Sequence, residues 1–161
     1  GGLSAYEFAG FISDVLPDFV ADLDPMVGGR FDKMTSMTAA DYLIRRRRLE
    51  VLTQAAHTAM EDVHAVVGPT IPITPPRIED VKEPSPYMKA NLMAARNTTT
   101  VNLLTMCAVT MPVALDAAGM PVGLHIVCPR NEDARSIAIA RAFEKQLGTA
   151  RERLGVPPLG V

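Results

Sequence analysis

The chain is poor in the residues that many cores and redox sites depend on. Its 161 residues include no tryptophan, three tyrosines, five phenylalanines and two cysteines, whereas methionine occurs nine times. We therefore expect an aliphatic core in which methionine fills irregular spaces. Cys107 and Cys128 are too far apart for a CxxC motif, so we expect two reduced, buried thiols in a cytoplasmic protein.

The chain also lacks a strong charge and a long apolar run. Its formal net charge of −2 gives no field that would attract nucleic acid. No uncharged apolar run reaches the roughly 18 residues that a membrane span needs. The first residues do not have the basic, apolar and small-residue parts of a secretory signal. We therefore expect neither nucleic acid nor a membrane among the partners.

The composition that remains is typical of a globular α/β protein, with 48% hydrophobic and 21% charged residues. The clearest pattern lies in residues 97–130, where apolar residues change from helical spacing to alternation. Val109–Leu115 and Val122–Cys128 each alternate as a strand does, and Gly119 and Pro121 between them favour a turn. This predicts a β-hairpin in which at least one strand is covered on both faces.

Helical spacing and capping residues predict four helices. Ser4 with Glu7, Thr38 with Asp41, and Asn131 with the acidic residues after it are typical helix starts. Pro17 must end or kink the first helix near Val15. The predicted helices cover residues 3–19, 38–61, 88–106 and 131–147, and a short strand is predicted at Val63–Val67.

The segments between these elements are predicted to be irregular. Residues 22–30 contain Pro25 and a Gly-Gly pair, and residues 68–76 are dense in proline and must be extended. Residues 77–87 are interpreted as an ordered surface loop, and the tail from Thr149 to Val161 as loosely attached. Arg45–Arg48 span more than a turn of helix, so a solvated face, with Arg46 paired to Glu50, is favoured over a nucleic-acid patch.

The familiar catalytic motifs are missing. No GxSxG, HExxH, GxGxxG or P-loop pattern is present. His57, His64 and His125 have no accompanying carboxylate pattern, so we expect no metal and no cofactor. His125 points away from Leu124 and Ile126, and it faces either a hydrogen-bond partner or a pocket. Cys107 follows the end of a helix, where the dipole disfavours a thiolate, so a nucleophilic role is not expected.

Four short motifs share a resemblance. They are Pro69-Thr-Ile-Pro72, Asn102-Leu103, Val109-Thr-Met-Pro112 and Gly119-Met-Pro-Val-Gly-Leu-His-Ile-Val127. Together they resemble the C-terminal part of the amidase signature family. The chain departs from the family pattern at Thr105, Cys107 and His125, where the family usually has Gly, Pro and Gln. The resemblance runs from about Asp41 to Leu147 and implies an α/β fold, the C-terminal portion of the amidase signature fold, with a mixed β-sheet hairpin flanked by helices.

The resemblance also implies where the chemistry lies. Family members use a Ser-Ser-Lys set from a Gly/Ser-rich region upstream of these motifs, and no residue of this chain matches it. The serines at 4, 13, 36, 85 and 136 are scattered, and Lys82 with Ser85 lacks a second serine. Residues 1–161 are therefore expected to be the C-terminal segment of one amidase-signature domain that lacks its N-terminal catalytic part. The isolated chain is expected to be inactive.

Substrate-binding residues and partners follow from the same resemblance. Thr98, Asn102, Met106 and Cys107 are the residues predicted to contact a small-molecule amide substrate or to support residues that do, although helix packing and capping is the role favoured for them. We expect self-association, preferably a dimer that completes the sheet, or pairing with the missing N-terminal part. The alternatives are a non-catalytic binding or assembly module derived from the amidase fold, and an unrelated α/β enzyme that uses His125.

Overall fold

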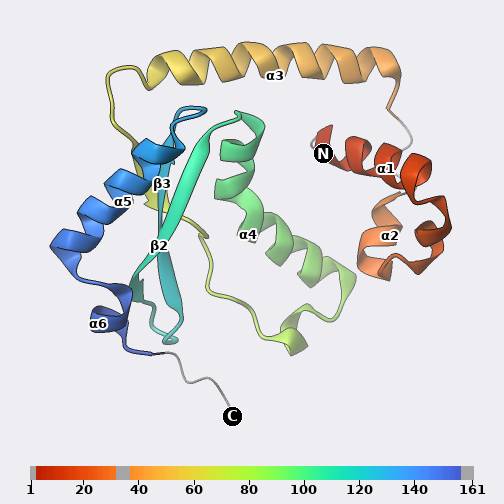
Figure 1. Cartoon of the computed structure of the whole chain (residues 1–161). Coiled ribbons are helices and arrows are strands. Elements are labelled where there is room, and N and C mark those ends of the chain that lie inside the picture. The colour runs from red at the N-terminus through yellow and green to blue at the C-terminus, as the bar shows by residue number, and fades with distance from the viewer. Residues whose placement is uncertain (1–2, 32–36, 157–161) are drawn as a thin grey trace. The chain divides into compact units, whose positions relative to one another are not determined.

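The computed structural model describes residues 3–31 and 37–156. The chain divides into two compact units, residues 1–51 and residues 52–161. Figure 1 labels its helices and strands. In chain order the elements are α1 (Leu3–Val15), a 3₁₀ helix (Pro17–Asp22), α2 (Pro25–Phe31), α3 (Ala39–Ala59), β1 (Val66–Pro69), a second 3₁₀ helix (Ile78–Val81), α4 (Pro84–Leu103), β2 (Cys107–Leu115), β3 (Pro121–Cys128), α5 (Asp133–Leu147) and α6 (Ala150–Leu154).

Proline sets the end of α1, as the sequence predicts. The helix stops at Val15, and a 3₁₀ helix with Pro17 in its first turn follows it. A residue that precedes proline is disfavoured in the helical region, which accounts for the break at Leu16. The predicted cap at Ser4 is wrong, because the helix already includes Leu3. The Glu7 carboxylate instead accepts a hydrogen bond from the Tyr42 hydroxyl at 2.7 Å.

The prediction of an irregular connector at residues 22–30 is wrong, because α2 occupies most of this segment. Asp24 starts this helix, and its carboxylate accepts a hydrogen bond from the Met26 N–H at 2.7 Å. Pro25 occupies the first helical position, where its missing N–H costs nothing. The Asp-Pro pair is thus a helix start rather than an interruption.

The start of α3 is confirmed as predicted. The Thr38 hydroxyl accepts a hydrogen bond from the Asp41 N–H at 3.1 Å and donates one to the Asp41 carboxylate at 2.7 Å. Arg45–Arg48 are all exposed, as expected of a solvated face. Arg46 lies 3.9 Å from the Glu7 carboxylate, and no ion pair joins it to Glu50 among the described residues.

The sheet of the second unit has three strands in the order β1-β3-β2, and both pairings are antiparallel. The predicted hairpin is confirmed as β2 and β3. Its turn uses Gly119 at φ +78°, a conformation that a side chain disfavours. A bulge interrupts the β2–β3 register between Pro112 and Ala114. The predicted strand at Val63–Val67 lies later in the chain, at Val66–Pro69.

The core of this unit lies on both faces of β3. Ile126 and Cys128 are fully buried on one face, and His125 and Val127 are each 8% exposed on the other. Helix α5 packs against β2 and β3, and α6 packs against β2. Figure 1 shows α4 and α5 on opposite sides of the hairpin. The prediction of a strand covered on both faces is therefore confirmed for the C-terminal half of β3.

Helix α4 begins earlier than predicted. Pro84 stands in its first turn, inside the segment expected to be a loop, and Ile78–Val81 of that segment forms a 3₁₀ helix. Proline fits the first turn of a helix because the N–H groups there have no partner within the helix.

The prediction that Asn131 caps α5 is also wrong. Asn131 has φ +66° and lies before the cap position, which Glu132 occupies without a side-chain capping bond. Asn tolerates the left-handed region better than most residues, so it forms the turn into the helix rather than its cap. The predicted placements of Asp133 in the first turn and Lys145 in the last turn are confirmed.

The segment after Gly148 is not loose where the structure describes it. Residues 150–154 form α6, with a capping box between Thr149 and Glu152. Arg153 donates hydrogen bonds to the carbonyls of Val113 at 2.7 Å and Pro112 at 2.9 Å. These carbonyls lie at the β2 bulge, so the arginine satisfies acceptors that the ladder leaves open. Residues 157–161 of the predicted loose tail lie outside the described residues.

Each unit exposes much apolar surface. In the first unit, Phe11, Phe19 and Ile44 are each more than half exposed. In the second, Val66 on β1 and Ile137 on α5 are also more than half exposed. None of the helices in the described ranges has the length and hydropathy of a membrane span.

Candidate functional site

Two hollows lie in the second unit, and Pro69 lines both of them. The first, here called the His125 cavity, measures about 520 Å³, and the second, here called the Thr110 cleft, measures about 650 Å³. Both fall within the range of small-molecule pockets. The His125 cavity is lined by Ala56, Ala59, Met60, Val66, Val67, Gly68, Pro69, Arg96, Asn97, Thr100, Val101, Leu104, Met106, His125 and Val127.

Strand register positions His125 in the middle of the sheet. It pairs with Gly68 on β1 and with Thr110 on β2. A Cβ atom built on Gly68 would meet nothing within 4 Å. The glycine therefore leaves open space beside the imidazole.

Two polar contacts hold helices over this part of the sheet. The Asn97 amide donates a hydrogen bond to the Pro69 carbonyl at 2.7 Å, which ties α4 to β1. A ring nitrogen of His57 lies 3.3 Å from the Leu104 carbonyl and joins the end of α3 to the end of α4. The Arg96 Nε donates to the Asn97 amide oxygen at 3.3 Å, which leaves the rest of its guanidinium available.

His125 is a buried polar side chain for which the described part of the chain offers no partner. It is 8% exposed, and the described residues supply no hydrogen-bond partner to its ring. Burial lowers its pKa below the ordinary value of 6.5, so the ring is neutral at pH 7. A neutral imidazole offers one donor and one acceptor. Of the two roles that the sequence left open, the structure favours the pocket.

The Thr110 cleft is formed by the proline-dense segment and the hairpin. The hydroxyls of Thr70 and Thr110 are hydrogen-bonded to each other, and the Thr70 N–H donates to the Gly123 carbonyl at 2.9 Å. A Cβ atom built on Gly123 would lie 2.7 Å from the Thr70 hydroxyl oxygen and 2.8 Å from that of Thr110. Glycine is thus the residue that lets the two threonines meet over β3.

The carboxylate in this cleft serves the turn rather than chemistry. Asp116 accepts hydrogen bonds from the Thr74 hydroxyl at 2.6 Å and from the N–H groups of Ala118 and Met120, both at 2.9 Å. These hydrogen bonds hold the pKa of Asp116 below its ordinary value, and the one from Thr74 has the largest effect. A carboxylate stabilised in its charged form is a poor general base near pH 7.

The four predicted substrate residues lie at the end of α4 and the start of β2. Met106 lines the His125 cavity. The Cys107 thiol donates to the Pro129 carbonyl at 3.1 Å, and the Thr98 hydroxyl donates to the Ala95 carbonyl at 3.2 Å within α4. Asn102 is exposed on the same helix. Contact of these four residues with a substrate stays a prediction. The hydrogen bonds of Cys107 and Thr98 are of the kind expected for the packing role that the sequence also allows.

The two cysteines are opposite each other in the β2–β3 register and are unpaired. Burial, more than the nearby Cys107, raises the pKa of the Cys128 thiol. A thiol held in its protonated form is a weak nucleophile and a weak metal ligand. Within residues 3–31 and 37–156, no group of three or more His, Cys, Asp or Glu side chains is arranged to hold a metal.

No described serine is placed as a nucleophile. Ser136 is buried on α5, and its hydroxyl donates to the Asp133 carbonyl at 2.8 Å. Ser4, Ser13 and Ser85 are exposed. In the described ranges, no serine hydroxyl is hydrogen-bonded to a lysine, so the part of the chain in view contains no Ser-Ser-Lys grouping.

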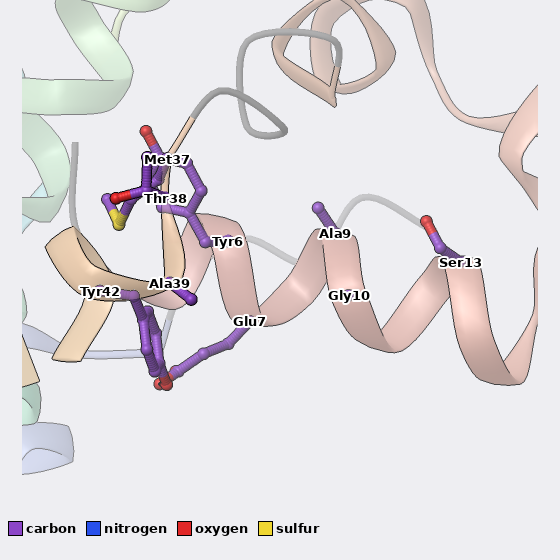
Figure 2. Close-up of a pocket in the computed structure, with 9 residues that line it drawn as sticks. All are labelled: Tyr6, Glu7, Ala9, Gly10, Ser13, Met37, Thr38, Ala39 and Tyr42. Carbon is purple, nitrogen blue, oxygen red and sulfur yellow. The ribbon is translucent and has the colours of Figure 1, made fainter.

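The first unit has a hollow of its own, which measures about 470 Å³. Figure 2 shows Glu7 of α1 and Tyr42 of α3 meeting at its rim, where their oxygens are hydrogen-bonded. Both oxygens are thereby engaged, and Glu7 and Arg46 are about half exposed. Among the described residues that line this hollow, no buried polar group calls for a ligand.

Sequence reasoning missed three contributors to the His125 cavity. Arg96 and Asn97 lie in a helix that shows no amphipathic charge pattern, and Gly68 lies in a segment judged only by its prolines. The one usable signal was the Gly-Pro pair at 68–69, because a glycine within a strand marks a place where something approaches the backbone.

The comparisons with known proteins agree on one family. The family model described as Amidase matches residues 12–137. The chain is 39% identical to 2-amino-5-chloromuconic acid deaminase of Comamonas testosteroni over 99% of its own length and 34% of the relative's. It is 32% identical to a fatty acid amide hydrolase of Medicago truncatula over 73% of its length and 20% of that protein.

The fold comparison gives the same result. A crystal structure of an amidase superposes with a TM-score of 0.72 at 23% identity and covers 89% of this chain and 33% of that one. The chain thus spans about a third, or less, of the length of the proteins it matches. The α/β fold expected from the sequence motifs is confirmed as part of this larger fold.

Proposed function

Because this chain belongs to the amidase family, we propose that it is the C-terminal part of an amidase-signature hydrolase that cleaves the C–N bond of a small carboxamide. The proposal includes the view that residues 1–161 are one segment of a single domain whose Ser-Ser-Lys set lies on another part of the protein. The observation that carries it is the match of nearly the whole chain, at 39% identity, to about a third of a deaminase.

The geometry of the chain supports a binding role for this segment. The His125 cavity and the Thr110 cleft are concave and mostly apolar, with few polar groups, as small-molecule sites are. No described group is poised as nucleophile or base. The chain would supply wall and support, and the oxyanion-stabilising and nucleophilic groups would come from the remaining part. The unpaired cysteines support the proposal of a cytoplasmic location.

An ammonia-release assay tests this division of labour. The probes are butanamide, as a simple carboxamide, and 2-amino-5-chloromuconic acid, the compound in the relative's name. The chain alone should release no ammonia above the buffer. Co-expressed with the part of the Comamonas testosteroni relative that precedes the aligned region, it should co-purify with that part and release ammonia from one of the probes.

Each other outcome decides against a part of the proposal. Ammonia release by the chain alone, surviving replacement of every serine, would show that its chemistry does not depend on the absent set. Failure to co-purify would overturn the pairing. A complex that co-purifies but releases nothing would favour the alternative of a non-catalytic binding or assembly module, which the exposed apolar side chains of both units also suit.

A further inference from the structure

The His125 cavity has the composition of a site for an acid with an apolar body. Of its fifteen lining residues, most are aliphatic, and the polar ones are Arg96, Asn97, Thr100 and His125. Arg96 is the one residue of this lining that is charged at pH 7, and no acidic side chain is among them. The cavity therefore presents a positive charge beside apolar surface, which favours a carboxylate on a hydrocarbon chain.

The buried imidazole is an independent sign of a ligand. A polar group that is 8% exposed normally has a hydrogen-bond partner, because burial without one leaves its desolvation uncompensated. The described residues give His125 none. Gly68, its neighbour on β1, leaves the adjoining space empty where any other residue would place a side chain.

The guanidinium of Arg96 is likewise available. Its Nε contacts Asn97, and among the described residues no carboxylate forms an ion pair with it. The Asn97 amide donates to the Pro69 carbonyl at 2.7 Å and accepts from the Arg96 Nε, so Asn97 positions the arginine side chain and does not compete with it for a ligand. The cavity thus has the positively charged guanidinium of Arg96 on α4 and the neutral imidazole of His125 on β3.

We propose that the His125 cavity binds a small organic carboxylate with an apolar body, whose carboxylate pairs with Arg96 while the buried His125 ring hydrogen-bonds to it or to a neighbouring polar atom. Binding of this kind needs no catalytic group, so the inference goes beyond the proposed function and stands or falls separately from it. The size of the cavity, about 520 Å³, suits a small acid rather than a polypeptide segment.

Titration of the full 161-residue chain with hexanoate tests the proposal, with the histidine ring signals followed by NMR. The His125 signal is assigned by its loss in His125→Gln. Hexanoate should shift this signal, and Arg96→Gln should weaken binding about tenfold, as expected for loss of a charge-assisted hydrogen bond. Arg130→Gln, which removes an exposed charge outside the cavity, should bind as the wild type does.

Gly68→Val separates the cavity from the surface. A valine at this strand position would occupy the open space beside His125, so hexanoate binding should be lost while the far-ultraviolet circular dichroism is kept. If that variant does not fold, Thr100→Leu on the exposed side of the same lining takes its place. The proposal is overturned if hexanoate leaves His125 unshifted, if the uncharged hexanamide binds as tightly, or if the filled variant binds normally.

Discussion

At the scale of single residues, the face of β3 that holds Gly123 and His125 has two different environments. Gly123 lies under the Thr70–Thr110 hydroxyl pair, where a side chain has no room. His125, two positions later, adjoins the open space over Gly68. The same strand face is therefore closed at one end and open at the other.

This difference predicts opposite effects of two small substitutions. Gly123→Ala should lower the free energy of unfolding by about 1–3 kcal/mol, because the new Cβ forces apart two threonines that contact each other. Gly68→Ala is the matched control, and it should leave stability unchanged or slightly raised, since its Cβ meets nothing within 4 Å. Urea unfolding followed by circular dichroism measures both, and equal losses in the two variants would contradict the steric account.

Residue-level prediction from the sequence succeeded where one periodicity decided the outcome. The alternation of β3 correctly placed His125 on the face opposite Leu124 and Ile126. It could not show that Arg96 and Asn97 approach the same cavity, because their positions depend on how α4 packs over the sheet. Tertiary packing of this kind leaves no local pattern in the sequence.

At the scale of elements, the Arg153 side chain joins α6 to the sheet by hydrogen bonds. Arg153 donates to the carbonyls of Val113, Pro112 and Gly148, two of which belong to the interrupted part of β2. Its planar guanidinium can serve several acceptors together, which a lysine could not do. Helix α6 thereby supplies hydrogen-bond donors to the carbonyls at the bulge in β2.

Removing this arginine should destabilise the hairpin. Arg153→Met keeps the apolar stem and deletes the hydrogen-bond donors. We expect the free energy of unfolding to fall by about 2 kcal/mol, which is the contribution of a hydrogen bond to a charged group. Arg151→Met, on the exposed side of the same helix, should have little effect. Amide hydrogen exchange at β2 should rise in the first variant only, and unchanged exchange there would show that the contact does not hold the strand.

The elements themselves were predicted unevenly, for physical reasons. The hairpin and the long helix α3 follow from a clear alternation and from the Thr38 cap. Helices α2 and α6 were not predicted, because proline and glycine were interpreted as residues that end helices. Pro25 instead occupies the first turn of α2, and Gly148 precedes the Thr149 cap of α6. Asn131 was misplaced because asparagine suits both a cap and a left-handed turn.

At the scale of the whole molecule, the three-stranded sheet has two outer strands, β1 and β2, and in the described part of the chain each of them pairs with β3 alone. Arg153 occupies two carbonyls of β2, whereas Val66 and Val67 of β1 are about half exposed. An unpaired strand with apolar side chains favours addition of another strand. The expected dimer would therefore join through β1.

Light scattering can decide this. The chain should have the mass of a dimer, and Val67→Lys should give a monomer, because a charge at the joining strand opposes pairing. Ile137→Lys, which places the same charge on the exposed face of α5, should leave the mass unchanged. A wild-type chain that is monomeric and binds no apolar dye would show that the free strand is not a contact surface.

The strand order also has a consequence for synthesis on the ribosome. The central strand of the sheet, β3, is the last of the three to be translated, so β1 and β2 emerge without the neighbour that each requires. Until Pro121–Cys128 has left the exit tunnel, the nascent chain holds two bare strands, which is the condition that recruits chaperones. A pause in translation before β3 has left the tunnel would prolong that exposure, whereas a later pause would not.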